Sequence, residues 1–181
     1  QFNLEEKTLT PALILKQYPV QWGIFWTGNT NHIMRFLAEV ARKAVPGAEV
    51  WDYTYLFDYD TPGFEKKFFE IPKDPRSLEK FLDGSMLSLY HVQSSRLIDQ
   101  VTTSQRHLKK KVCGIIFLTR SNAYQGRYTA PGEAHSPQEL YQRLVLLGAL
   151  GMDTVGLYPG KYIDAAFLPF IGKACYDVRM N

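Results

Sequence analysis

The sequence predicts an α/β protein built from five successive βα units. Three observations support this fold class. Short runs of apolar, aromatic and β-branched residues alternate with longer segments in which apolar residues recur at the helical period. Proline, glycine, aspartate and asparagine separate the two kinds of segment. Residues 112–118, VCGIIFL, are apolar on both faces, as expected of a strand in a parallel sheet that helices cover.

The first half of the chain contains two of these units. Residues 20–26, VQWGIFW, form an apolar run of strand length, and residues 31–44 carry apolar side chains at the helical period until a Pro-Gly pair follows. Residues 49–57, EVWDYTYLF, are aromatic and β-branched and therefore predict a second strand. A long loop rich in Asp, Pro and Gly comes next, and residues 76–82 are predicted to form a short helix.

The second half contains three units. Its predicted strands are apolar runs at residues 85–92, 112–118 and 154–158. Its predicted helices are amphipathic segments at residues 95–109, 137–150 and 163–178. The clearest helix start is Ser136-Pro137-Gln138-Glu139, because Ser is a favoured N-cap, Pro suits the first helical position and Glu completes a capping box.

Two architectures fit five parallel strands joined by helical crossovers. The one we expect is part of a (β/α)8 barrel, a fold that typically needs about 250 residues, whereas this chain has 181. In that case the chain is a fragment or subunit, and a complementing polypeptide supplies the remaining strands. The alternative is an open, doubly wound parallel sheet. We expect residues 1–19 to be an N-terminal extension or linker, and residues 20–181 to be a single α/β domain or the C-terminal portion of a barrel.

Composition argues against several classes of function. The net charge of +3 is too small to indicate a nucleic-acid-binding protein, and no apolar run reaches the roughly 18 residues that a membrane span needs. Cys113 and Cys175 have neither a disulfide-scaffold pattern nor metal-ligand spacing, and the histidines are scattered, so we expect no metal centre. An N-terminal Gln without a recognisable signal peptide is consistent with a processed extracellular or lumenal chain, although the sequence does not fix the compartment.

The stretch TGNTNHIMRFLAE resembles the phosphate loop of flavodoxins. That resemblance implies a flavodoxin-like doubly wound sheet that holds FMN at Thr27, Gly28, Asn29 and Thr30, where a helix N-terminus would face the phosphate. The sequence departs from the flavodoxin pattern at Phe25, where a Ser or Thr is expected. Under the barrel interpretation we expect no cofactor, and Thr30 would be a helix N-cap.

A second resemblance covers a larger part of the chain. Four stretches of the chain resemble the closing part of a glycoside-hydrolase TIM barrel. They are VCGIIFLTR, APGEAHSPQELYQRLVLLGALGMDTVGLYPG, YIDAAFLPFIGKA and the earlier HIMRFLAEVARKAVPGAEVWDYTY. This resemblance implies a carbohydrate ligand bound by the loops at the C-terminal ends of the strands. The substrate-binding residues that it implies follow the predicted strands, at Trp26, Asn29, Tyr90, His91, Arg120, Tyr124 and Tyr158.

Glycosidic cleavage ordinarily needs two carboxyl groups that flank the scissile bond. The candidates are Glu133, Asp58 and Asp60, and the structural alternative for the two aspartates is a turn or capping role. Many of the resembling enzymes end a strand in Asn-Glu, whereas the corresponding residues here are Trp26-Thr27. Three hypotheses therefore stay open at this point: a glycan-binding or glycan-hydrolysing barrel segment, an FMN-binding redox domain, and a non-catalytic structural or assembly protein derived from a glycosidase-like barrel.

Overall fold

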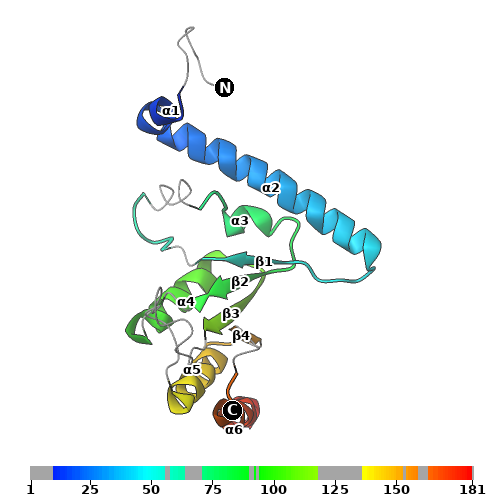
Figure 1. The fold of residues 1–181 in the computed structure, drawn as a ribbon, viewed down its shortest axis with the longest axis vertical. Coiled ribbons are helices and arrows are strands. Elements are labelled where there is room, and N and C mark those ends of the chain that lie inside the picture. Colours follow the sequence, from blue (N-terminus) through cyan, green and yellow to red (C-terminus); the bar gives the residue numbers. More distant parts are fainter. Residues whose placement is uncertain are drawn as a thin grey trace.

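The structure is a computed structural model, shown in Figure 1, and it describes residues 10–55, 58–63, 71–89, 92, 94–117, 136–152, 154–158 and 163–180. The helices are α1 (Pro11–Gln17), α2 (Pro19–Ala44), α3 (Pro75–Leu78), α4 (Leu97–His107), α5 (Pro137–Ala149) and α6 (Leu168–Met180). Two short 3-10 helices are η3 (Ser94–Arg96) and η5 (Ala165–Phe167). The strands are β1 (Trp51–Thr54), β2 (Gly84–Ser88), β3 (Lys111–Phe117) and β4 (Val155–Tyr158).

The strands of the described residues form one parallel sheet in the order β1-β2-β3-β4. The predicted α/β fold class is therefore confirmed. With right-handed crossovers, a sequential strand order sends the connecting helices to the same face of the sheet. A doubly wound sheet instead reverses its strand order and carries helices on both faces, and the described strands contain no such reversal. The arrangement is compatible with a partial barrel.

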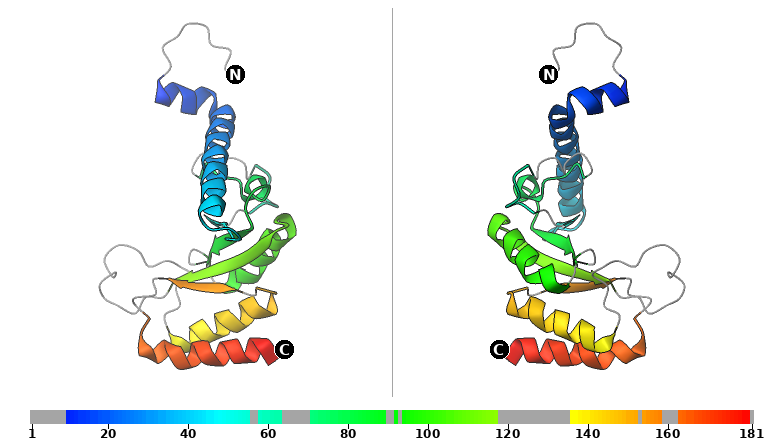
Figure 2. Two further views of the ribbon diagram at one scale, coloured as in Figure 1. Left: turned by 90° about the vertical axis from the view of Figure 1, so that its right-hand side faces the viewer. Right: turned by 90° about the vertical axis from the view of Figure 1, so that its left-hand side faces the viewer.

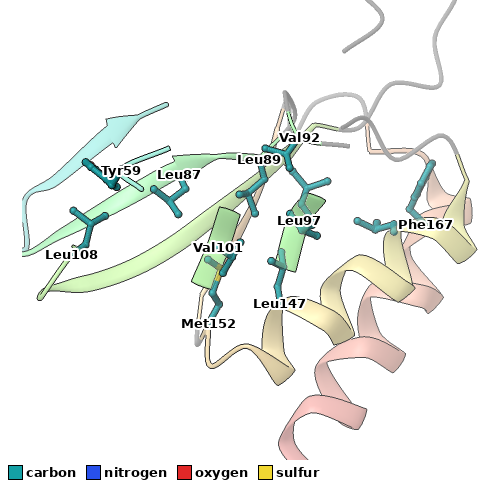
Figure 3. Close-up of a cluster of buried hydrophobic side chains, with 12 residues drawn as sticks. Tyr59, Leu87, Leu89, Val92, Leu97, Val101, Leu108, Leu147, Met152 and Phe167 are labelled. Atoms are coloured by element: carbon teal, nitrogen blue, oxygen red, sulfur yellow. The ribbon is translucent and has the colours of Figure 1, made fainter. Parts of the chain in front are cut away.

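One face of the sheet packs against α4, α5 and the start of α6 to form the main core (Figure 3). Leu87 and Leu89 at β2 and Ile116 on β3 point into this core and are at most 1% exposed. Gly114 lies on the same face, and a Cβ there would come within 2.4 Å of Leu89 Cδ1. The core is completed by buried residues from the loops and helices, namely Tyr59, Val92, Leu97, Val101, Leu108, Leu140, Leu147, Met152 and Phe167.

The long helix α2 corrects the sequence prediction. Residues 20–26 were expected to be a strand, but they form the first part of α2, and the predicted helix at residues 31–44 is its second part. A short apolar run cannot be distinguished from a helical segment by its hydrophobicity alone. Pro19 suits the first turn of a helix. The interior of α2 contains two glycines, Gly23 and Gly28, and a helix tolerates each of them at a cost of about 1 kcal/mol.

The other predicted elements are found within a few residues of their expected bounds. β1, β2, β3 and β4 lie inside or beside the strands expected at residues 49–57, 85–92, 112–118 and 154–158. The capping box is confirmed in part, because Ser136 Oγ accepts a hydrogen bond of 3.1 Å from the Glu139 amide at the start of α5. Within the expected N-terminal extension, residues 11–17 form α1, which Thr10 caps.

Helix α2 joins the rest of the molecule through its C-terminal half (Figure 2). Ala38 packs with Leu78 and Leu82 in a small second core. Arg42 donates hydrogen bonds to the Phe81 carbonyl oxygen at 2.9 Å and to Asp83 Oδ2 at 2.6 Å. The Val50 amide also donates to Asp83, and this bond, together with the Arg42 guanidinium, lowers the pKa of the Asp83 carboxyl. These contacts fix α2 beside α3 and the start of β1.

A buried ion pair holds β1 to the segment before α3. Asp52 lies on the helix-covered face of β1 with a fully buried side chain, and Lys73 Nζ donates to Asp52 Oδ1 at 2.5 Å and to the Tyr53 carbonyl oxygen. The second carboxylate oxygen, Asp52 Oδ2, is buried and has no hydrogen-bond partner among the described residues. Burial raises the pKa of Asp52, and the hydrogen bond and charge of Lys73 oppose that rise.

Replacing Gly28 tests the helical assignment of residues 27–30. Gly28 is exposed inside α2, and an added Cβ would meet nothing within 4 Å. We expect Gly28→Ala to raise the free energy of unfolding by about 0.5–1 kcal/mol, because alanine is the better helix former. Chemical denaturation followed by circular dichroism measures the change. Gly84→Ala is the contrasting variant. Its Cβ would lie 2.7 Å from the Lys111 carbonyl oxygen, so this substitution should lower the free energy of unfolding. A Gly28→Ala variant less stable than the wild type would contradict the assignment of residues 27–30 to a helix.

Removing Lys73 tests the buried ion pair. We expect Lys73→Met to lower the free energy of unfolding by about 3 kcal/mol near neutral pH, because it leaves the Asp52 charge buried and uncompensated. The folded variant then holds a proton on Asp52 that the unfolded chain releases, so the loss grows as pH rises above the ordinary carboxyl pKa and shrinks in mild acid. Denaturant titrations near neutral pH and in mild acid measure the free energy of unfolding at each pH. Lys111→Met, which removes the exposed Lys111–Glu49 pair, is the control and is expected to change little. An equal loss of unfolding free energy near neutral pH and in mild acid would contradict the role assigned to the Asp52 charge.

Candidate functional site

The sheet face opposite the main core carries a group of aromatic side chains. Neighbouring residues of a parallel pair point to the same side, so the strand register assigns each residue to a face. On the side away from Leu87 and Ile116 the register places residues that include Trp51, Tyr53, Tyr55, Gly84, Met86, Ser88, Lys111, Cys113, Ile115, Gly156 and Tyr158, where the side chains of Ser88 and Cys113 are buried. We call this set the open sheet face. It faces away from the helices that form the core.

Three tyrosines make the open sheet face accessible and partly polar. Tyr53 is 42% exposed, Tyr55 is 41% exposed and Tyr158, at the C-terminal end of β4, is 58% exposed. Tyr53 Oη donates a hydrogen bond of 3.2 Å to the buried hydroxyl of Ser88. Such a surface offers flat aromatic rings beside hydroxyl groups. It is therefore suited to bind a ligand that has both apolar faces and hydrogen-bonding groups.

The shape of this face depends on one glycine in the inner strand β2 and one in the outer strand β4. A Cβ on Gly84 would lie 2.5 Å from the Trp51 ring, so the indole of Trp51 occupies the space beside the β2 backbone. Trp51 Nε1 also donates to Glu49 at 3.1 Å. A Cβ on Gly156 would lie 3.3 Å from Ile115 Cγ1, so Gly156 leaves β4 flat beside that side chain. The sequence thus shapes the open sheet face by placing glycine beside larger residues.

Asp58 and Asp60, two of the predicted catalytic residues, have structural partners. Asp58 is exposed and accepts a hydrogen bond of 2.7 Å from the Thr61 hydroxyl. Asp60 binds three side chains of α4, with distances of 2.8 Å to His107 Nε2, 2.9 Å to Arg106 Nη1 and 3.3 Å to Thr103 Oγ1. The hydrogen bond with His107 and the Arg106 charge lower the pKa of Asp60. Asp60 is therefore a carboxylate that anchors the segment after β1 to α4.

Tyr59, between these two aspartates, strengthens the same anchor. Its ring is buried between Arg76, whose guanidinium carbon lies 5.0 Å from the ring centroid, and His107, whose ring centroid lies 5.1 Å away. Burial raises the pKa of the Tyr59 hydroxyl above its ordinary value. The segment that follows β1 is thus attached to both α3 and α4 through one aromatic side chain.

The other predicted site residues do not gather at one edge of the described sheet. Trp26 and Asn29 are exposed on α2, so their expected position at a strand end is wrong. Tyr158 is at the end of β4, as expected. The remaining predicted residues lie outside the described residues and stay predictions, namely Tyr90, His91, Arg120, Tyr124 and Glu133.

The turn expected for an FMN phosphate is also wrong. Thr27, Gly28, Asn29 and Thr30 are all inside α2, and Thr27 is buried. Backbone amides in a helix interior donate to carbonyl groups one turn earlier and do not face a ligand. The sequence pattern therefore forms no phosphate loop here, and the FMN prediction loses the local geometry on which it depended.

A hollow of about 690 Å³ lies beside α2, lined by Asn31, His32, Arg35, Glu39, Arg42, Lys80 and Phe81. Its charged groups largely satisfy one another. Arg35 pairs with Glu39 at 2.9 Å, and Arg42 pairs with Asp83 at 2.6 Å. These side chains have structural partners, so the hollow is a weaker candidate for a site than the open sheet face.

Neither a metal centre nor a reactive thiol emerges from the described residues. No three of their His, Cys, Asp or Glu side chains are grouped so that they could hold a metal ion. Cys113 is a buried free thiol whose pKa burial raises to about 11, and Cys175 is an exposed free thiol on α6. None of the helices in the described part of the chain has the length and hydropathy required to cross a lipid bilayer.

Sequence reasoning missed Tyr53 and Tyr55, although a signal for them was present. In WDYTY an aromatic residue occupies every second position, which in a strand places all three rings on one face. The prediction considered only residues that follow the strands. Alternation along the strand was therefore the pattern that could have identified them.

Comparison with known proteins supports the fold. No protein-family profile and no curated protein matches the chain. Among solved structures, a chitinase from Chromobacterium violaceum is similar, with a TM-score of 0.61 and 13% sequence identity. The match covers 82% of this chain, and the chain spans about 61% of the length of that chitinase. At this identity the likeness concerns the fold alone, so the chain has a loosely glycosidase-like α/β fold.

Proposed function

We propose that this chain is part of a glycosidase-like (β/α)8 barrel and that it binds a glycan on the open sheet face, near the C-terminal ends of the strands. The sequential parallel order of the strands supports the barrel, because each strand of a barrel wall is followed by a helix on the outer face. The similar fold of a chitinase also supports it. In a barrel the open sheet face lines the interior, which packed side chains fill, so the residues available to a ligand are those at the C-terminal ends of the strands, here Tyr55 and Tyr158.

The observation that carries the proposal is the exposure of Tyr53, Tyr55 and Tyr158 on the sheet face opposite the main core. A parallel sheet in an α/β fold is normally covered on both faces. Exposed aromatic rings on a rigid sheet are suited to contact the apolar C–H faces of sugar rings, while the hydroxyl groups of the same tyrosines are suited to hydrogen-bond sugar hydroxyls. The ligand class that we propose is a chitin-like oligosaccharide, by analogy with the structural neighbour.

Hydrolysis would need a protonated acid as well as a carboxylate. The partners of Asp60 lower its pKa, which does not suit a general acid. Asp60 also binds Arg106 and His107 in the last turn of α4, which leads to the start of β3, so it lies away from the C-terminal ends of the strands. Glu133 is then the candidate acid, with Asp58 as its partner. The structural contacts of Asp58 and Asp60 favour a second candidate function, in which the chain binds a glycan without cleaving it.

Binding can be measured by calorimetry with a soluble chito-oligosaccharide. We expect Tyr55→Ala and Tyr158→Ala each to weaken binding by about tenfold, because each removes a contact ring of the kind that dominates binding energies. Tyr176→Ala is the matched control, since Tyr176 is 64% exposed on α6 and lies away from the open sheet face. Binding that is unchanged in both variants, or equally weakened in the control, would contradict the proposed binding surface.

Hydrolysis can be tested separately on a chromogenic chito-oligosaccharide. If the chain is catalytic, we expect Glu133→Gln and Asp58→Asn to reduce kcat by at least about a hundredfold, the scale of general acid–base catalysis, while Asp177→Asn on α6 leaves it unchanged. Full turnover in Glu133→Gln would remove Glu133 from the mechanism. Binding without turnover in the wild-type protein would establish the non-catalytic function.

A further inference from the structure

Helix α2 carries a row of side chains, most of them large and apolar, that is largely exposed among the described residues. The row consists of Trp22, Trp26, Asn29, Ile33, Phe36 and Val40, and we call it the α2 seam. Ile33 is 57% exposed, Phe36 is 60% exposed and Val40 is 46% exposed. Phe25 and Leu37 flank the seam with exposures of 48% and 52%. A contiguous apolar surface of this kind marks an interaction site.

The other side of α2 is unusual because its buried residues are small. Gly23, Thr27 and Ala38 are the buried residues of the helix, and Ala38 is the one that packs in the core with Leu78 and Leu82. A helix at the surface of a globular protein ordinarily turns its large apolar side chains inward and its polar residues outward. Since α2 does the opposite, its large side chains must serve a contact outside the described fold.

The spacing of the seam identifies the kind of partner. Its residues are separated alternately by four and three positions, which is the heptad spacing of a coiled coil. The β-branched residues Ile33 and Val40 lie seven residues apart, in equivalent heptad positions, and Asn29 is the polar member. A heptad row meets a partner helix by inserting its side chains into the spaces between the partner's side chains. The seam therefore fits a helix.

We propose that α2 is a dimerisation helix and that the seam packs against α2 of a second copy of this chain. Closed two-fold dimers, in which the same surface meets itself, are the commonest protein oligomers, and a heptad row is self-complementary. The exposed parts of six apolar side chains at and beside the seam, namely Phe25, Trp26, Ile33, Phe36, Leu37 and Val40, amount to about 600 Å² per copy, against about 800 Å² for a standard stable interface. Side chains next to the seam supply the remainder.

The aromatic cluster at the N-terminal half of α2 prepares this surface for binding. The rings of Trp22 and Phe25 are stacked with centroids 5.6 Å apart, and Trp26 meets Trp22 edge-on at 5.5 Å. These contacts hold the rings in place before a partner arrives, so less side-chain entropy is lost on association. The proposal is independent of glycan binding, because the seam and the open sheet face lie on different elements.

The test measures the mass of the 181-residue chain in solution by size-exclusion chromatography with light scattering. We expect the wild type to be a dimer and Ile33→Asp and Phe36→Asp to be monomers with unchanged circular dichroism. Ile24→Asp is the matched control and should remain a dimer. Ile24 is 68% exposed on the same helix, but two residues along a helix rotate by about 200°, which turns Ile24 away from Trp22 and Trp26.

A second variant tests the same surface by strengthening it. A polar residue in a heptad core lowers the stability of the assembly. We therefore expect Asn29→Leu to lower the dimer dissociation constant by about tenfold. A wild-type monomer at all concentrations overturns the proposal and assigns the seam to another partner, such as further strands of a barrel or a lipid surface. A dimer that survives Phe36→Asp, or is unaffected by Asn29→Leu, overturns it as well.

Discussion

The structure depends on the sequential pairing of parallel strands. Since right-handed crossovers take each connecting helix to the same side, α4 and α5 meet over one face of the sheet and form the main core there. That geometry leaves the other face to the alternate residues of the same strands. The candidate site is thus a consequence of topology. Tyr53 and Tyr158 are presented on a rigid support because Leu87 and Ile116, on the neighbouring inner strands, are buried on the opposite face of the sheet.

The segment at residues 58–60, after β1, is also held firmly by its contacts with the helices. A parallel strand usually passes into a flexible connection, but here Tyr59 inserts between Arg76 and His107 while Asp60 binds α4. The segment is held by aromatic packing and charge together. The side chains that follow β1 are therefore positioned by α3 and α4.

Much of the fold could be predicted from the sequence, and the failures have physical explanations. The strands at β2, β3 and β4 were predictable because buried parallel strands have continuous apolar runs that turn residues delimit. The strand expected at residues 20–26 was wrong because VQWGIFW is also one stretch of a heptad row, and only a window that extended to Val40 would have revealed the longer period. The site was less predictable. Its residues come together through strand register, which local sequence patterns do not encode, and two of the expected residues were assigned to a strand end that is a helix.

The lengths of the strands have a consequence for how this molecule meets others. The outer strands β1 and β4 have four residues each, whereas the inner strands β2 and β3 have five and seven. Short edge strands expose few unpaired amide and carbonyl groups, so they limit pairing with unrelated chains and the growth of fibrils. The further strands of the proposed barrel would pair with these same edges. Copies of the chain are therefore expected to associate through side-chain contacts and not through backbone hydrogen bonds between strand edges.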